Sequence, residues 1–246
     1  MVDKALFIGT DSAKNAMREL QVLTNNLANI NTTGFRADFE AKNQQAITDK
    51  GQQTRVYSVS SKTYSDFDHG PIINTGRDLD VAVSGDGFLT VQSKTGKEGY
   101  TRAGDLEIRN GVLTTHNGEA VMGISGVISF PGDAERVHIG ADGTVGVKIK
   151  GNNRIITVNR LKLTAPPVSE LQKGTDGLFY KTDGSSARPS DKVKLTMGSL
   201  EGSNVNPVQA LTDLIELSRQ FEMHTNLIKV VEDSSTKANQ ILSLPK

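Results

Sequence analysis

Paired carboxylates and isolated histidines are the first side chains in this sequence to weigh as catalytic groups. Asp78 and Asp80 are two residues apart, so on a strand both would point to the same face, beside Arg77. A solvated or salt-bridged surface pair is the expected state of such carboxylates, rather than an acid–base couple. No metal-ligand spacing relates the histidines, which are His69, His116, His138 and His224. His224 falls within an otherwise apolar stripe, where an interface role is expected.

Glycine-containing turns are the second class of candidate. Repeated Asp-Gly pairs could suggest calcium loops, but no loop has acidic residues at positions one, three, five and twelve. Gly85-Asp86-Gly87 lacks the third glycine of a dinucleotide-binding turn, and no Gly-Lys-Ser/Thr phosphate loop occurs. The absence of Cys excludes disulfides, thiol catalysis and zinc sites of the Cys type. We therefore expect no enzyme, and no catalytic, cofactor-binding or metal site.

The composition is that of a folded protein with balanced charge. The 246 residues are 36% apolar and 23% charged, with 28 basic and 28 acidic side chains. This balance gives no general attraction to nucleic acid or to an anionic membrane. No apolar run reaches the roughly 20 residues needed to span a bilayer. Asp3, Asp11 and Glu19 stand where a cleavable signal peptide would need a basic start and an apolar stretch.

Apolar residues at alternating three- and four-residue steps predict a helix at the N-terminus. It is expected from about Asp3, the candidate N-cap, to Asn31, with Gly34 closing it in a left-handed conformation. Its stripe comprises Leu6, Gly9, Ala13, Ala16, Leu20, Leu23, Leu27 and Ile30. Asn25, Asn26, Asn29 and Asn31 are expected to bond backbone groups where this helix ends, and Phe35 to fold back onto an apolar surface.

The same spacing of apolar residues predicts a longer helix at the C-terminus. Asn206 is the expected N-cap, Pro207 occupies the first helical position, and Gln209 is placed to complete a capping box. The helix should end before Pro245. Its stripe comprises Ala210, Leu214, Leu217, Phe221, His224, Ile228, Val231, Ser235, Ala238 and Leu242.

The sequence pattern in the middle of the chain predicts short antiparallel strands. Turn dipeptides that supply positive φ values occur at Asp86-Gly87, Asn110-Gly111, Asn117-Gly118, Asp142-Gly143, Asp176-Gly177 and Asp183-Gly184. Strands are expected at 79–83, 88–91, 106–108, 137–139, 145–149, 155–163 and 193–197. The predicted class is α+β, with a coiled-coil-like pair of terminal helices and a mainly antiparallel β domain between them. The expected parts are an N-terminal assembly helix (1–34), an extended connector (35–74) that orders against a neighbour, a β-rich domain (75–200) and a C-terminal assembly helix (201–246).

Two arrangements of the helices are open. They could pair with each other as a self-contained stalk, or pack on other molecules. Apolar residues outside the main C-terminal stripe, at Leu211, Ile215, Leu227 and Val230, favour the second arrangement because a further apolar face needs a further partner.

Four stretches, in order, carry a resemblance to a known family. They are Leu23-Thr24-Asn25-Asn26-Leu27-Ala28-Asn29-Ile30-Asn31-Thr32-Thr33-Gly34-Phe35-Arg36, then residues 75–88 (TGRDLDVAVSGDGF), then 100–106 (YTRAGDL), then 202–207 (GSNVNP). Together they resemble the bacterial flagellar axial proteins, the family of rod, hook and hook-associated subunits. Its motif residues here are Asn25, Asn26, Leu27, Asn29, Thr33, Gly34 and Phe35. The opening residues 1–7, the Gly-Arg-Asp-Leu-Asp form and Lys97-Glu98-Gly99 are most similar to proximal rod members, with a distal rod or hook-type subunit as the alternative.

The resemblance implies a structural subunit of the basal-body rod, the drive shaft that transmits torque from motor to hook in bacterial motility. It implies that the terminal helices pair and pack with neighbouring subunits into a helical assembly, with the β domain outside them. Implied partners are other copies, other rod subunits and the flagellar type III export apparatus, with no nucleic acid and no membrane insertion. The implied location is the periplasmic rod, reached without a cleaved signal peptide. A secreted β domain that binds glycan or peptidoglycan is the alternative of another class, and 5% aromatic residues with no Trp give it few stacking platforms.

Overall fold

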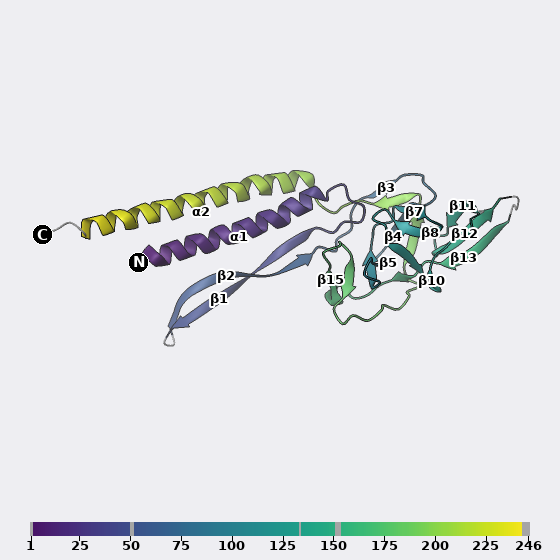
Figure 1. Cartoon of the computed structure of the whole chain (residues 1–246), viewed down its shortest axis with the longest axis horizontal. Helices are drawn as coiled ribbons and strands as arrows, with labels where there is room; N and C mark the ends of the chain where they lie inside the picture. The colour runs from purple at the N-terminus through teal and green to yellow at the C-terminus, as the bar shows by residue number, and fades with distance from the viewer. Residues whose placement is uncertain (1, 50–51, 133, 151–153, 243–246) are drawn as a thin grey trace. The chain divides into compact units, whose positions relative to one another are not determined.

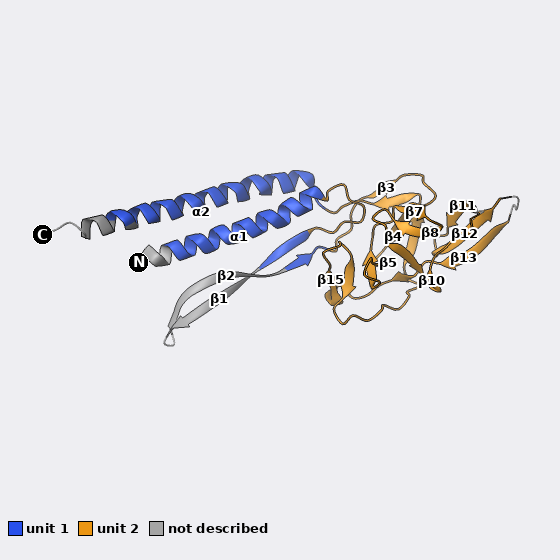
Figure 2. Ribbon diagram, viewed as in Figure 1, with its two compact units in different colours: residues 1–28, 38–66, 205–246 blue, residues 29–37, 67–204 orange. Residues whose placement is uncertain are grey.

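The computed structural model describes residues 2–49, 52–132, 134–150 and 154–242 (Figure 1). Within these ranges only the backbone is described at 2–5, 42–49, 52–62, 134–135, 235 and 238–242. The chain divides into two units (Figure 2). Unit 1 comprises Met1–Ala28, Asp38–Asp66 and Val205–Lys246, and unit 2 comprises Asn29–Ala37 and Phe67–Asn204. These boundaries differ from the four consecutive parts expected from the sequence, because each unit is assembled from separated segments.

Unit 1 contains the two terminal helices, α1 (Val2–Ala28) and α2 (Pro207–Leu242). They run side by side in opposite directions (Figure 1). Asn206 caps α2 as predicted, because its Oδ1 accepts hydrogen bonds from the backbone N–H groups of Val208 at 3.0 Å and Gln209 at 3.2 Å. The predicted capping box is wrong, since the Gln209 side chain donates to Asp213 Oδ1 at 2.7 Å instead.

The start and end of α1 also differ from the prediction. The helix begins at Val2, so Asp3 lies inside it and is not the N-cap. It ends at Ala28, three residues before the expected Asn31. Gly34 does adopt the predicted left-handed conformation, with φ of 66°, but it lies six residues beyond the helix and so does not close it.

A long β-hairpin occupies most of the segment expected to be a connector. β1 (Asp38–Asp49) pairs antiparallel with β2 (Gln52–Ser65), with register shifts between Ala41 and Lys42 and between Ile47 and Thr48. The polar composition that suggested a connector is compatible with a two-stranded ribbon, because its backbone groups bond across the pair and β-branched and aromatic residues favour strands.

Unit 2 is built from antiparallel sheets. Its strands are β3 (Ile72–Asn74), β4 (Val81–Ser84), β5 (Phe88–Gln92), β6 (Glu98–Thr101), β7 (Leu106–Arg109), β8 (Val112–Thr115), β9 (Ala120–Gly123), β10 (Gly126–Val127), β11 (Ala134–Ile139), β12 (Thr144–Ile149), β13 (Ile155–Arg160), β14 (Leu163–Thr164), β15 (Leu171–Lys173), β16 (Phe179–Lys181), β17 (Lys194–Met197) and β18 (Ser199–Glu201). A short 3₁₀ turn, η1 (Val168–Glu170), precedes β15. In the described residues the main sheet has the order β15-β16-β6-β5-β9-β8-β7, with β10 on β9 and β14 on β5. Smaller sheets are β11-β12-β13, β17-β4 and β18-β3.

The core of unit 2 is aliphatic and draws on nearly every sheet. Val81 and Val83 of β4 point into it together with Leu89 and Val91 of β5, as period-two alternation requires. A second, aromatic cluster contains Phe88, Tyr100, Phe179 and Ala187. The α+β class, with helices at both ends and a mainly antiparallel β region between them, is therefore confirmed.

Turn chemistry explains how these strands reverse. Asn110 and Gly111 have φ values of 52° and 76° and join β7 to β8, as expected of an Asn-Gly hairpin turn. The Asp86-Gly87 prediction is wrong in detail, because the positive φ in that loop belongs to Gly85, at 76°.

Candidate assembly site

The N-terminal stripe faces α2 of the same chain. Gly9, Ala13 and Ala16 are buried, and a Cβ placed on Gly9 would lie 3.1 Å from Ile228 Cγ1. The small residues therefore permit a close helix approach, as their pattern suggested, but the helix that approaches belongs to the same molecule. Leu20, Leu23 and Leu27 are half-buried and Leu6 is exposed. Ile30, expected on the helix, is half-buried beyond its end, in unit 2.

The C-terminal stripe forms the other half of this contact. Ala210 and Leu217 are buried. The half-buried members of the stripe are Leu214, Phe221, His224, Ile228 and Val231. Leu242 ends α2, but its side chain lies outside those described, as do those of Ser235 and Ala238. The two stripes are thus covered at least in part by each other.

A second apolar surface of α2 stays uncovered. Ile215 is 56% exposed and Val230 is 63% exposed. At roughly 100° per residue, these positions lie on the side of α2 opposite the stripe that faces α1, rather than beside it. We call the exposed large apolar residues of α2 the exposed row; its members are Val208, Leu211, Ile215, Met223, Leu227 and Val230. Leu227 lies at the edge of the contact with α1, because a Cβ on Gly9 would be 3.3 Å from its Cδ2.

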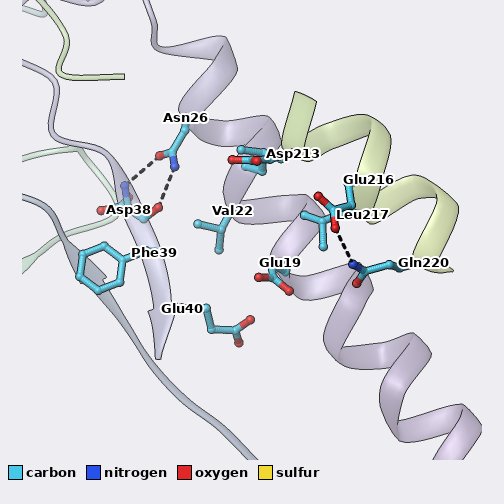
Figure 3. A pocket seen from close by; sticks show the side chains of 11 residues that line it. Glu19, Val22, Asn26, Asp38, Phe39, Glu40, Asp213, Glu216, Leu217 and Gln220 are labelled. Carbon is cyan, nitrogen blue, oxygen red and sulfur yellow. Dashed lines mark hydrogen bonds between the residues drawn. The ribbon is translucent and has the colours of Figure 1, made fainter. Parts of the chain in front are cut away.

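A cleft of about 440 Å³ lies between α1, α2 and β1 within unit 1 (Figure 3). Its lining contains five carboxylates and no basic side chain: Glu19, Asp38, Glu40, Asp213 and Glu216 stand with Val22, Leu23, Asn26, Phe39, Leu217 and Gln220. Gln220 Nε2 donates to Glu216 Oε1 at 3.4 Å across one helical turn. No nucleophile and base are brought together there, and among the side chains described no group of three or more His, Asp or Glu residues could hold a metal ion.

Asn26 of the family motif connects α1 to β1. Its Nδ2 donates to the carbonyl of Asp38 at 2.7 Å, and its Oδ1 accepts the Asp38 N–H at 2.8 Å (Figure 3). The side chain is buried. The prediction that it bonds backbone groups is confirmed, but the groups belong to the first residue of the hairpin and not to the end of the helix.

The other motif residues lie around the turn that follows α1. Asn25 is exposed, and Leu27, Asn29 and Thr33 are half-buried. Asn29 Oδ1 accepts a hydrogen bond from Thr32 Oγ1 at 3.1 Å. Phe35 is half-buried, and Lys173 Nζ lies over one face of its ring, 4.0 Å from the centroid.

Gly34 is needed for close backbone approach as well as for its positive φ. A Cβ at this position would lie 2.3 Å from the carbonyl carbon of Arg102 and 2.4 Å from the nitrogen of Ala103. Its N–H donates to the carbonyl of Glu201 at 2.7 Å. This glycine therefore brings the end of the first motif against both the third motif and the residue before the fourth.

A buried ion cluster joins the same motifs inside unit 2. Glu201 is 0% exposed, and its carboxylate accepts from Arg36 Nη2 at 2.7 Å and from Arg102 Nε at 2.6 Å. The two arginines are 1% and 3% exposed. We call these three residues the Glu201 cluster. Nothing in the sequence spacing predicted it, because Arg36 and Glu201 are 165 positions apart.

The excess positive charge of the Glu201 cluster is distributed to backbone carbonyls. Arg102 donates to the carbonyls of Val83, Gly85 and Gly87 at 2.8 to 3.0 Å, and Arg36 Nη1 donates to that of Asp68 at 2.7 Å. Burial raises the pKa of Glu201, but the charges and hydrogen bonds of Arg102 and Arg36 outweigh it and hold this pKa below its usual value of 4.5. The carboxylate is therefore ionised at neutral pH.

Asp80, weighed above as half of a solvated or salt-bridged surface pair, is buried, so the expected surface position is wrong for this residue. It accepts a hydrogen bond from Thr75 Oγ1 at 2.6 Å and forms an ion pair with Arg77 at 3.1 Å. Asp78 is half-exposed and pairs with Arg136 at 3.1 Å. Both carboxylates are engaged by partners, as expected of structural ion pairs.

Three family models match the chain in order. A "Flagella basal body rod protein" model covers residues 10–36, a "Flagellar hook protein FlgE/F/G D1 domain" model covers 82–147, and a "Flagellar basal body rod FlgEFG protein C-terminal" model covers 197–241. The first and third contain Arg36 and Glu201, and the second contains Arg102.

Full-length relatives agree with these matches. The flagellar basal-body rod protein FlgF of Escherichia coli is 36% identical over 251 aligned residues, which cover 99% of this chain and 100% of the relative. FlgF of Caulobacter vibrioides is 32% identical, over 96% of this chain and 97% of the relative. FlgG of Buchnera aphidicola subsp. Schizaphis graminum is 30% identical, over 90% of this chain and 93% of the relative.

No helix within the described residues is both long and apolar enough to cross a membrane. The resemblance seen in the sequence is confirmed, and so is the expectation of a structural protein rather than an enzyme. The chain belongs to the flagellar basal-body rod protein family and is FlgF-like within it.

Proposed function

We propose that this chain builds the proximal part of the flagellar basal-body rod by presenting one preassembled helix pair to its neighbours. α1 and α2 act as a coiled-coil-like unit whose apolar stripes pack against each other, while the exposed row of α2 is free to bind neighbouring subunits. The exposed row on α2 is the observation that carries this proposal, because its apolar side chains remain in water when α1 is already in place.

Burial of the exposed row gives the driving force for assembly. Each large aliphatic side chain that is fully buried contributes about 1.5–3 kcal/mol. α2 is 36 residues long, which corresponds to roughly 54 Å, so one helix can contact neighbours at more than one height. Partners of this kind are further copies of the chain and other rod subunits.

The location follows from the same assignment. The subunit functions in the periplasmic rod, transmits torque from motor to hook, and reaches its place through the flagellar type III export apparatus. The absence of Cys in a chain bound for an oxidising compartment supports this route.

The test replaces Ile215 and Val230 with Asp in one variant. Both side chains point away from α1, so the helix pair and unit 2 should stay folded while incorporation into basal bodies and swimming are lost. Asn226→Asp is the matched control, since it adds a charge at an exposed position of α2 without removing apolar surface. Circular dichroism checks folding, and complementation of a deletion strain measures swimming. Normal incorporation and swimming of the Ile215→Asp/Val230→Asp variant would refute the proposal.

A further inference from the structure

The Glu201 cluster occupies the place where all chain segments of unit 2 that continue into unit 1 come together. Unit 2 begins at Asn29, is interrupted between Ala37 and Phe67, and ends at Asn204. Every covalent connection between the units therefore passes through residues 29–37, 67–70 or 201–204. Glu201 accepts bonds from the first of these segments through Arg36 and from the second through the Gly70 N–H at 3.1 Å.

Further bonds tie the same three segments to one another. The Ala37 N–H donates to Asn204 Oδ1 at 2.7 Å, and Asn204 Nδ2 donates to the carbonyl of Asp68 at 3.1 Å. The Gly34 N–H donates to the carbonyl of Glu201 at 2.7 Å. Arg102, by contrast, comes from the centre of the β unit, after β6, and joins Glu201 to the loop between β4 and β5 through its other nitrogens.

We propose that the Glu201 cluster is the mechanical anchor of the subunit, through which force entering along the terminal helices passes into the β unit. This inference rests on the proposed rod function, in which the helices experience torque. A force on any one connecting segment is shared by the other two and delivered through Arg102 to the core. Without the shared carboxylate, each connecting segment would bear the applied force alone, and the segments would detach from unit 2 one after another.

The chemistry of the cluster suits this role. Arginine retains its charge at all relevant pH values and donates in several fixed directions at once. Arg36 uses Nη1 for Asp68 and Nη2 for Glu201, so it holds two segments together by itself. A buried carboxylate between two guanidiniums cannot exchange its partners for water without opening the surrounding structure.

Single-molecule stretching tests the anchor directly. The chain has no Cys, so Asn31→Cys, which precedes Arg36 in the first connecting segment, and Val208→Cys, which follows the last segment, give two unique, exposed attachment points. At constant force, Glu201→Gln should shorten the lifetime of the folded anchor by about 100-fold relative to the parent, because two buried arginines lose their shared charge. Arg36→Lys keeps the charge but has a single nitrogen and should shorten it by about tenfold.

Glu98→Gln is the matched control. It removes another partly buried ion pair of unit 2, between Glu98 and Lys162 Nζ at 2.8 Å, which lies outside the three connecting segments. Its lifetime between the same attachment points should stay within about twofold of the parent. If Glu201→Gln does not fold, the lifetime of Arg36→Lys at constant force tests the anchor by itself. Unchanged lifetimes in both cluster variants, or an equal loss in Glu98→Gln, would overturn the anchor. Because the measurement uses the isolated chain, this result is independent of whether the exposed row drives rod assembly.

Discussion

Gly34→Ala provides a sharp test of the junction at which the family motifs meet. The left-handed φ of 66° costs an alanine about 1–2 kcal/mol. The new Cβ would also lie 2.3 Å from the carbonyl carbon of Arg102, and backbone cannot move aside as a flexible side chain can. Overpacking of this kind adds roughly 1–3 kcal/mol, so we expect unit 2 to lose about 2–5 kcal/mol of its free energy of unfolding.

Gly76→Ala isolates the steric part of that loss. Gly76 has φ of 69°, but a Cβ there would meet no atom within 4 Å. This control carries the same conformational cost and the same change in unfolded-chain entropy, so it should lose only about 1–2 kcal/mol. Urea unfolding followed by tyrosine fluorescence, in a chain without Trp, measures both variants. Equal losses would show that the contact between Gly34 and the Arg102 backbone does not constrain the fold.

Two further predictions concern hydrogen bonds whose partners are defined. Asn26→Ala removes both hydrogen bonds to Asp38 and should lower the free energy of unfolding by about 2 kcal/mol. The Asp38 amide should then exchange faster, whereas a Gln21→Ala control on the exposed side of α1 should leave its exchange rate unchanged. Unchanged exchange at Asp38 in Asn26→Ala would refute the prediction. Burial, together with the nearby Glu98 carboxylate, raises the pKa of Tyr100 from 10.0 to about 12. The protonated phenol therefore stabilises the fold fully below pH 10, and the free energy of unfolding should fall by up to about 2–3 kcal/mol as the pH rises from 10 to 12. Absorbance at 295 nm should show a tyrosine ionising near pH 12 in the parent that is missing in Tyr100→Phe. A parent whose four tyrosines all ionise near pH 10 would contradict this.

The features predicted correctly from the sequence are those fixed by neighbouring residues. Asn206 caps α2 because the N–H groups that it satisfies belong to the next residues of the chain. The Asn110-Gly111 turn follows from the conformations open to those two residues alone. For the apolar stripes, periodicity shows that a helix face will be covered but not by which helix, so packing on neighbouring molecules stays a prediction.

The features that sequence reasoning missed depend on long-range contacts. The β1–β2 hairpin has few large apolar residues, and its strands are specified by cross-strand backbone bonds that no local pattern reveals. Arg36 and Arg102 resemble ordinary surface arginines in the sequence, and only the fold buries them against Glu201. A usable signal was present nonetheless: both arginines belong to the stretches that carried the family resemblance, and Glu201 directly precedes the last of them.

The interrupted course of the chain through the two units has a consequence for the order of folding. α1 and α2 are separated by nearly 180 residues, and closing a flexible loop of that length costs roughly 4–5 kcal/mol in chain entropy. Once unit 2 is folded, the bond between Gly34 and Glu201 already holds the two ends of that loop together. The two helices then meet at a high effective concentration, so folding of unit 2 should precede and promote the pairing of α1 with α2.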